Sequence, residues 1–232
     1  MHECRSVRRD VGVNAGSAAG RRLVLVRHGQ TASNVARALD TRPPGAPLNE
    51  RGRAQAAALA ERVLGDPVVG PIGAVYASIA TRAQQTAAPV AAALGLDVQV
   101  IEGAHEIFVG AALENRSDVE AREEFERVHA AWERGDLDAR PPGGESAREL
   151  RERFAAAIAA IPAPTTGAAL LVSHGAAIRL GAAALLGDTV EAAYLDNTGV
   201  VVLAANGAGW SLQHWDPAPP RPGDVTAGAD AE

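Results

Sequence analysis

Residues 23–31 read LVLVRHGQT, and this stretch indicates both a fold and the place of a functional site. Residues 23–26 form a short aliphatic run, which is typical of a strand buried on both faces of a parallel sheet. Arg27, His28 and Gly29 follow where that strand would end. Ligands of open α/β sheets bind at the C-terminal ends of the strands. We therefore expect a strand that carries Arg27 and His28 to a site, with a solvated Arg–His pair as the alternative on this stretch alone.

Two further strand ends follow the same pattern. Residues 169–175, ALLVSHG, again run from aliphatic residues into a His-Gly pair, His174 and Gly175. Glycine at such a position lets the backbone turn sharply or approach a ligand closely. Residues 75–87, VYASIATRAQQTA, place Arg82 in the first turn of the next helix, where free N–H groups favour a bound anion. The repetition makes a merely solvated Arg–His pair an insufficient explanation.

Apolar runs alternate with amphipathic stretches along most of the chain. The patterns predict strands at 22–26, 74–77, 98–101, 170–173, 200–204 and 210–214, and helices at 49–64, 81–94, 119–134, 145–161 and 176–186. Pro89 is expected to kink or restart the second of these helices. The alternation predicts a three-layer α/β/α fold with a mostly parallel central sheet of about six strands.

Composition shifts indicate the limits of this domain. Residues 1–20 and 217–232 are rich in small residues or proline and have no apolar period, so we expect a disordered extension and a flexible tail around a domain at 21–216. Residues 103–144 break the strand–helix rhythm with an acidic, arginine-containing segment that ends in PPGG. We expect this segment to be a small helical insertion over the active site.

The overall composition excludes several functional classes. With 47% hydrophobic and 22% charged residues, the 232-residue chain has an ordinary globular composition. Its net charge of −6 argues against a nucleic-acid partner, although a local arginine cluster can still hold a small phosphate. Cys4 is the single cysteine, so neither an internal disulfide nor a cysteine-based zinc site is expected. Without an apolar run of about 20 residues or a signal sequence, we expect a cytoplasmic protein with no membrane partner; a homodimer is compatible with the pattern.

Four blocks of sequence carry a family resemblance over residues 22–216. They are Arg27-His28-Gly29-Gln30-Thr31 with Asn34, Ser78 to Arg82 continuing to Gln85-Thr86-Ala87, Glu106 with Gly110, and Ser173-His174-Gly175. In order and spacing they resemble the histidine phosphatase superfamily, in its phosphoglycerate mutase-like branch. The resemblance implies phosphoryl transfer through a phosphohistidine.

The chemistry of the residues agrees with that implication. An imidazole attacks phosphorus only as the neutral base, so His28 is the predicted nucleophile, with a backbone carbonyl expected on its other ring nitrogen. Phosphoryl transfer also needs donors around the equatorial oxygens. Arg27 and Arg82 offer charged planar forks, His174 a third donor and Asn34 a neutral fourth. The predicted phosphate site is completed by three further motif residues, Thr31, Gln30 and Gly175. Thr31 can instead cap a short helix.

The leaving alkoxide needs a proton, and a carboxylic acid is the usual source. Glu106 lies four residues before Gly110, the spacing that the superfamily uses for its proton donor, whereas Glu102 and Glu114 are weaker candidates. His105, beside Glu106, is interpreted as a surface or capping residue. Arg116 is the basic residue predicted to set specificity by meeting a substrate carboxylate or second phosphate.

Other notable residues are interpreted as structural. Phe125, Val128 and Trp132 at helical spacing indicate packing, and His129 shows no signal of a partner. A metal site of His28, His174 and Glu106 is geometrically conceivable but is disfavoured, because Arg27 and Arg82 would crowd a cation with positive charge. No metal and no cofactor are therefore expected.

Two activities share such a site. Mutases that the chain resembles read ERHYG after the acidic residue and have a longer, lysine-containing insertion, whereas residues 106–110 here read EIFVG and the chain has no lysine. We therefore predict a metal-independent phosphatase that acts on a small phosphorylated metabolite. The alternatives are a 2,3-bisphosphoglycerate-dependent phosphoglycerate mutase and a catalytically inactive phosphate-binding module.

Overall fold

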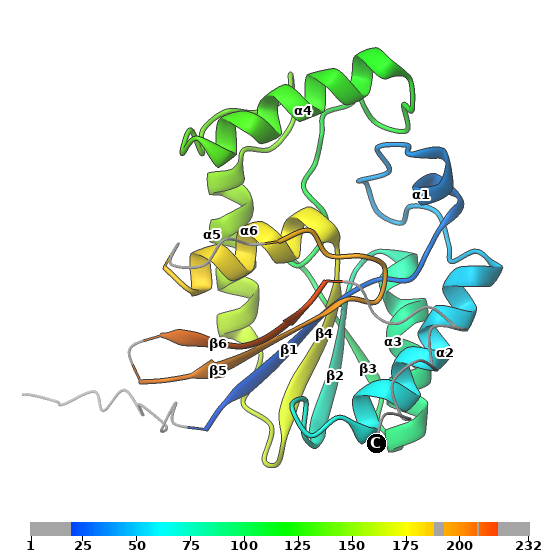
Figure 1. Cartoon of the computed structure of the whole chain (residues 1–232), viewed down its shortest axis with the longest axis vertical. Helices are drawn as coiled ribbons and strands as arrows, with labels where there is room; N and C mark the ends of the chain where they lie inside the picture. Colours follow the sequence, from blue (N-terminus) through cyan, green and yellow to red (C-terminus); the bar gives the residue numbers. More distant parts are fainter. Residues whose placement is uncertain (1–19, 188–192, 208, 218–232) are drawn as a thin grey trace, which may run out of the picture.

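The computed structural model describes residues 20–187, 193–207 and 209–217 (Figure 1). The expected terminal extension and tail therefore lie, except at their inner edges, outside the described residues. No helix within the described part of the chain is long and apolar enough to cross a membrane.

A six-stranded mixed sheet forms the centre of the molecule. Its strand order is β3-β2-β4-β1-β5-β6. The first four of these strands are parallel, while β5 and β6 are antiparallel to their neighbours. The strands lie within two residues of their predicted positions, at β1 Arg22–Arg27, β2 Ile72–Ser78, β3 Val98–Ile101, β4 Ala168–Ser173, β5 Val200–Ala205 and β6 Trp210–Asp216.

The alternation of side chains along β1 explains the three layers. Leu23 and Leu25 point into one apolar cluster, which includes Phe154 of α5 and Ile178 of α6. Val24 and Val26 point into a second cluster, formed with α2 and α3 on the opposite face. These four side chains are fully buried, as expected for a strand covered on both faces.

Helix ends follow their capping residues. The bounds are α1 Ala32–Ala36, α2 Glu50–Gly65, α3 Thr81–Leu94, α4 Val119–Glu133, α5 Ala147–Ala160 and α6 Gly175–Leu185. Asn49 caps α2, and Ser146 caps α5 in a capping box. The predicted restart at Pro89 is wrong, because α3 continues through it. Ala87 and Val90, on either side of the proline, are fully buried, and their packing holds the helix together.

The segment between β3 and α5 builds a small core of its own. Val109, Leu113 and Ala121 form a separate buried cluster, against which Leu39 and Phe125 pack. In Figure 1, α4 and α1 lie beyond the ends toward which β1 and β4 run. This segment and the loop after β1 therefore stand on either side of the C-terminal edge of the sheet.

Candidate active site

A cleft of about 230 Å³ opens at the C-terminal ends of β1 and β4. Parallel strands bring their C-terminal ends to one edge, and this brings together motifs that are far apart in the sequence. His174 lies buried beside the cleft, with its ring centroid 5.1 Å from that of His28. The predicted site residues that line the cleft are Arg27, His28, Thr31, Asn34, Arg82, Glu106 and Gly175.

His28 is held with one ring nitrogen toward the backbone and the other toward the cationic side of the cleft. Nδ1 lies 2.7 Å from the carbonyl oxygen of Gly29, so Nδ1 carries the proton and donates it there. Nε2 consequently keeps its lone pair, and the Nε of Arg82 donates to it at 3.2 Å. The backbone carbonyl expected from the sequence is thus Gly29.

Burial and charge keep His28 neutral. The side chain is buried, and this desolvation, followed by the charges of Arg82 and Arg27, lowers its pKa well below the usual value of 6.5. The unprotonated imidazole is therefore the ordinary state near neutral pH. This is the form that can attack phosphorus.

The turn after β1 can pack against the first turn of α2 only because a glycine lies on each side of the contact. A Cβ on Gly29 would lie 2.7 Å from the carbonyl oxygen of Gly52, and a Cβ on Gly52 would lie 2.0 Å from that of Gln30. Gln30 itself anchors the turn to α2: its side-chain oxygen accepts from Asn49, and its N–H donates to Gln55. Gln30 does not line the cleft, so its predicted contact with phosphate is replaced by this anchoring role.

His174 occupies the N-cap position of α6 and is fully buried. Its Nε2 lies 2.7 Å from the hydroxyl of Ser78, whereas its Nδ1 has no hydrogen-bond partner among the described residues. Burial, and then the charge of Arg82, lowers the pKa of His174 well below its usual value. A neutral imidazole that accepts from Ser78 at Nε2 has its proton on Nδ1, free to donate to a ligand.

The two predicted arginines are anchored by backbone carbonyls and keep further donors unused. Arg82 is buried, and its Nη2 donates to the carbonyl of Asp40 at 3.0 Å. Arg27 donates through Nη1 to the carbonyl of Leu195 at 2.6 Å and to the hydroxyl of Tyr194 at 3.0 Å. Within the described chain, the buried Arg27 Nε and Arg82 Nη1 have no hydrogen-bond partner. Buried donors without partners are costly, and phosphoryl oxygens would satisfy them.

Asn34 and Thr31 form the neutral side of the cleft. The side-chain oxygen of Asn34 accepts from the backbone N–H of Thr31 at 3.1 Å and from the amide of Asn197 at 3.3 Å. With its oxygen turned this way, Asn34 keeps its NH₂ group for other acceptors. The Thr31 hydroxyl accepts from the backbone N–H of Asn34, so Thr31 does cap α1.

Glu106 is fixed against the first turn of α6. Its Oε1 accepts from the backbone N–H groups of Ile107 and Ala177, at 2.9 and 3.0 Å, and its Oε2 accepts from that of Ala176 at 3.2 Å. The free N–H groups at the helix start thus orient a carboxylate that also lines the cleft. The weaker carboxylate candidates, Glu102 and Glu114, do not line the cleft, and neither does His105.

The structure does not bring Arg116 into the cleft. Its guanidinium forms two hydrogen bonds with Asp118, at 2.9 and 2.7 Å, and its side chain is 41% exposed. Although Arg116 follows Glu106 closely in sequence, the turn at residues 110–116 directs it to solvent, where an acidic neighbour is available. The specificity role expected from the sequence is therefore not supported by its position.

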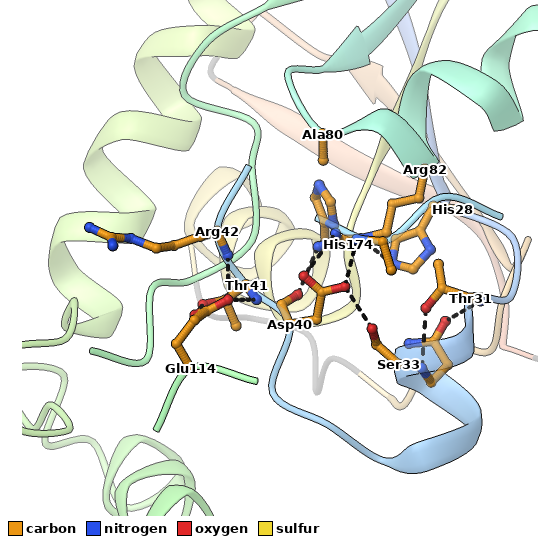
Figure 2. A network of polar contacts seen from close by, with 12 residues as sticks. His28, Thr31, Ser33, Asp40, Thr41, Arg42, Ala80, Arg82, Glu114 and His174 are labelled. Atoms are coloured by element: carbon orange, nitrogen blue, oxygen red, sulfur yellow. Dashed lines mark hydrogen bonds and ion pairs between the residues drawn. The ribbon is translucent and has the colours of Figure 1, made fainter. Parts of the chain in front are cut away.

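Asp40 and Asn197 are site residues that the sequence patterns did not indicate. The carboxylate of Asp40 lies 3.6 Å from Arg82 and accepts from the hydroxyl of Ser33 at 2.8 Å (Figure 2). Asn197 donates to the carbonyl of His28 at 2.9 Å. A signal for Asn197 exists: β5 runs antiparallel to β1, so residues just before β5 lie beside the end of β1.

Two residues of α4 also line the cleft, although the sequence indicated only packing or no partner. Phe125 packs on the small core described above and also faces the cleft. The Nε2 of His129 lies 3.1 Å from Nη1 of Arg179, a third arginine of the lining, and its Nδ1 lies 3.4 Å from Glu133. The packing interpretation was thus incomplete for Phe125, and His129 has partners that the sequence did not signal. Among the described residues, no group of three or more His, Cys, Asp or Glu could hold a metal ion.

Comparison with known proteins agrees with this geometry. A family model described as the histidine phosphatase superfamily (branch 1) matches residues 23–217. The chain belongs to this superfamily. Its members in these comparisons include both phosphatases and a protein named as a mutase.

Two sequence relatives differ in how much they share with this member of the superfamily. Over 166 residues this chain is 35% identical to "Probable phosphoglycerate mutase GpmB" of Salmonella paratyphi B. The match covers 70% of this chain and 74% of that protein. A match to the PE-PGRS family protein PE_PGRS11 of Mycobacterium tuberculosis is 43% identical over 86 residues and covers 37% of this chain but only 14% of that protein.

Two solved structures share the fold. One is a mycobacterial glucosyl-3-phosphoglycerate phosphatase complexed with VO3, which is 28% identical with a TM-score of 0.72, covering 85% of this chain and 100% of that chain. The other is the alpha-ribazole phosphatase of Shigella flexneri, which is 26% identical with a TM-score of 0.67, covering 85% of this chain and 96% of that chain.

Proposed function

We propose that this chain is a phosphatase that hydrolyses a small phosphomonoester, without a metal ion, through a phosphohistidine on His28. The observation that carries the proposal is the bond from Nδ1 of His28 to the Gly29 carbonyl, which leaves Nε2 as a neutral nucleophile beside Arg82. The unused donors of Arg27, Arg82 and His174 fit the oxygens of a phosphoryl group.

The reaction proceeds in two displacements. In the first, Nε2 of His28 forms a bond to phosphorus while the bond from phosphorus to the ester oxygen breaks, and the arginines neutralise charge on the equatorial oxygens. In the second, water attacks the phosphohistidine, the N–P bond breaks, and inorganic phosphate leaves. His28 returns to its neutral form with its Nδ1 proton in place throughout.

Glu106 is the proposed proton carrier of both displacements. As the acid it protonates the departing alkoxide, and as the resulting carboxylate it takes a proton from the attacking water. Its position supports this role, because the backbone N–H groups of Ala176 and Ala177 hold it at the start of α6, next to the turn that carries His174.

The charges of the cleft favour hydrolysis over the mutase reaction. A bisphosphate cofactor brings a second phosphate that also needs cations. A third arginine, Arg179, also lines the cleft, but it already bonds to His129, while Asp40 adds a carboxylate. A single phosphoryl group fits this balance better than two.

The test is phosphate release in EDTA from a panel of phosphomonoesters that includes p-nitrophenyl phosphate and 3-phosphoglycerate. Formation of 2-phosphoglycerate is followed in parallel, with and without 2,3-bisphosphoglycerate. We expect release without isomerisation, and its loss in His28→Ala. Isomerisation that depends on the bisphosphate would establish the mutase instead, and phosphate binding without any turnover would establish an inactive module.

A further inference from the structure

The cleft has two chemically different parts. The part around His28 is cationic, whereas another group of lining side chains is apolar. Three of them form what we call the apolar wall: Leu39, Val109 and Phe125. Ile107 and Leu195 add further apolar surface to the lining.

The apolar wall is built by the loop after α1 and by the segment that contains α4, not by the central sheet. Val109 belongs to the small buried cluster, and Leu39 and Phe125 pack against that cluster while remaining only partly buried. Part of their apolar surface therefore faces the cleft, where burial against an apolar group would be favourable. The wall joins the loop after α1 to α4, so a ligand body placed there would contact both.

The cationic residues near this wall already have a partner or are needed by the transferred phosphoryl group. Arg27 and Arg82 lie beside the nucleophile and belong to the transferred phosphoryl group. Arg179 bonds to the imidazole of His129, and burial together with the Arg179 charge lowers the pKa of that imidazole, which keeps it neutral. Asp40 places a carboxylate in the same cleft and would repel another anion.

We propose that the substrate is the phosphomonoester of an uncharged alcohol that carries a compact apolar body, such as a single ring, seated on the apolar wall. The inference rests on the proposed function, since it concerns the leaving group of that reaction. The cleft volume of about 230 Å³ sets the size, because it is smaller than the roughly 300–1,000 Å³ of most ligand pockets. A phosphoryl group and one ring would therefore fill much of it.

The test compares esters whose leaving groups are all primary alcohols, so that leaving-group chemistry does not decide the result. Benzyl phosphate is compared with glycerol 1-phosphate, which is polar but has an uncharged alcohol, and with 3-phosphoglycerate, which adds a carboxylate. We expect kcat/KM for benzyl phosphate to exceed that for glycerol 1-phosphate at least tenfold, with 3-phosphoglycerate lowest. Equal or better hydrolysis of either comparison ester would overturn the inference.

Variants of α4 connect the preference to the wall. We expect Phe125→Ala to lower the ratio of kcat/KM for benzyl phosphate over glycerol 1-phosphate about tenfold, while Phe125→Leu, which stays apolar, keeps most of the ratio. Val119→Ala is the matched control, since Val119 is 58% exposed on the same helix and lies outside the cleft. Should Phe125→Ala reduce both esters equally in a folded protein, Phe125 would be only structural and the inference wrong.

A different result would show that the proposed phosphatase function, and not the inference about the ligand, is wrong. If the chain hydrolyses none of the esters, p-nitrophenyl phosphate included, the proposal that it is a phosphatase is wrong. A binding measurement then tests which class of ligand the cleft takes. Calorimetry should then show benzylphosphonate binding at least tenfold more tightly than 3-phosphonopropionate. Equal affinities would overturn the inference as well.

Discussion

At the scale of single residues, Asp40 connects three parts of the site. Its carboxylate faces Arg82 at 3.6 Å and accepts from the Ser33 hydroxyl and from the N–H of Ala46, at 2.8 and 2.9 Å (Figure 2). Its backbone carbonyl accepts from Arg82 as well. Asp40 therefore holds the arginine that contacts His28.

Asp40→Asn should lower kcat more than it raises KM. An amide cannot both accept from Ser33 and Ala46 and present an oxygen to Arg82 as a carboxylate does, so the guanidinium would shift beside His28. We expect kcat to fall about tenfold, equivalent to about 1.4 kcal/mol. Ser33→Ala is the control, because it removes one bond to Asp40 and no charge. If the two variants lost the same activity in steady-state kinetics, the positioning role would be refuted.

Glu106→Gln should make the reaction depend on the leaving group. Without a proton donor, an alkyl phosphate must expel a strongly basic alkoxide, whereas a dinitrophenolate leaves without help. We expect kcat/KM for an alkyl phosphate to fall about 10²- to 10³-fold and that for 2,4-dinitrophenyl phosphate to fall less than about fivefold. A uniform loss across a series of leaving groups would argue against Glu106 as the acid.

At the scale of elements, the turn after β1 depends on its close approach to α2. Gly29 and Gly52 meet there, and Gln30 is tied to Asn49 and Gln55. The position of α2 thus sets the position of the backbone beside His28.

Gly52→Ala should therefore destabilise the protein and reduce activity together. Its Cβ would lie 2.0 Å from the carbonyl oxygen of Gln30, so the turn or the helix must move. We expect the free energy of unfolding to fall by about 2–3 kcal/mol in urea titrations. Gly65→Ala on the same helix has open space around its new Cβ and should change stability by no more than about 1 kcal/mol. Similar behaviour of the two variants would contradict this account.

At the scale of the whole molecule, the buried histidines at and near the cleft make the free energy of unfolding depend on pH. Burial lowers the pKa values of His28 and His174 well below 6.5, and those of His105 and His129 move in the same direction. Below pH 6.5 the unfolded chain therefore binds more protons than the folded chain. The contribution of these histidines to the free energy of unfolding is therefore fully present above about pH 6.5 and is lost as the pH falls below that value.

This dependence can be measured in phosphate-free buffer between pH 7.5 and 5.5. Each buried histidine contributes a slope of up to about 1.4 kcal/mol per pH unit once the pH is below its unfolded pKa. His174→Asn should flatten the fall in the free energy of unfolding relative to the unsubstituted chain. A variant with an unchanged slope would show that His174 is protonated in the folded state.

The sequence by itself determined the sheet strands, most helices and the residues at the strand ends. Local patterns were sufficient there, because burial on both faces demands aliphatic runs, and parallel strands bring the residues after these runs to one edge of the sheet. His28, Arg27, Arg82 and His174 meet at the cleft for this reason.

Only the tertiary structure decided which other residues join them. Asp40 and Arg179 reach the cleft from a loop and from a helix, and Asn197 bonds to the carbonyl of His28 from just before an antiparallel strand. No local pattern encodes such approaches. Arg116 and Gln30 sit close to motif residues in sequence but bond elsewhere, to Asp118 and to Asn49. Side-chain contacts depend on the path of the folded backbone, so closeness along the chain did not predict closeness at the site.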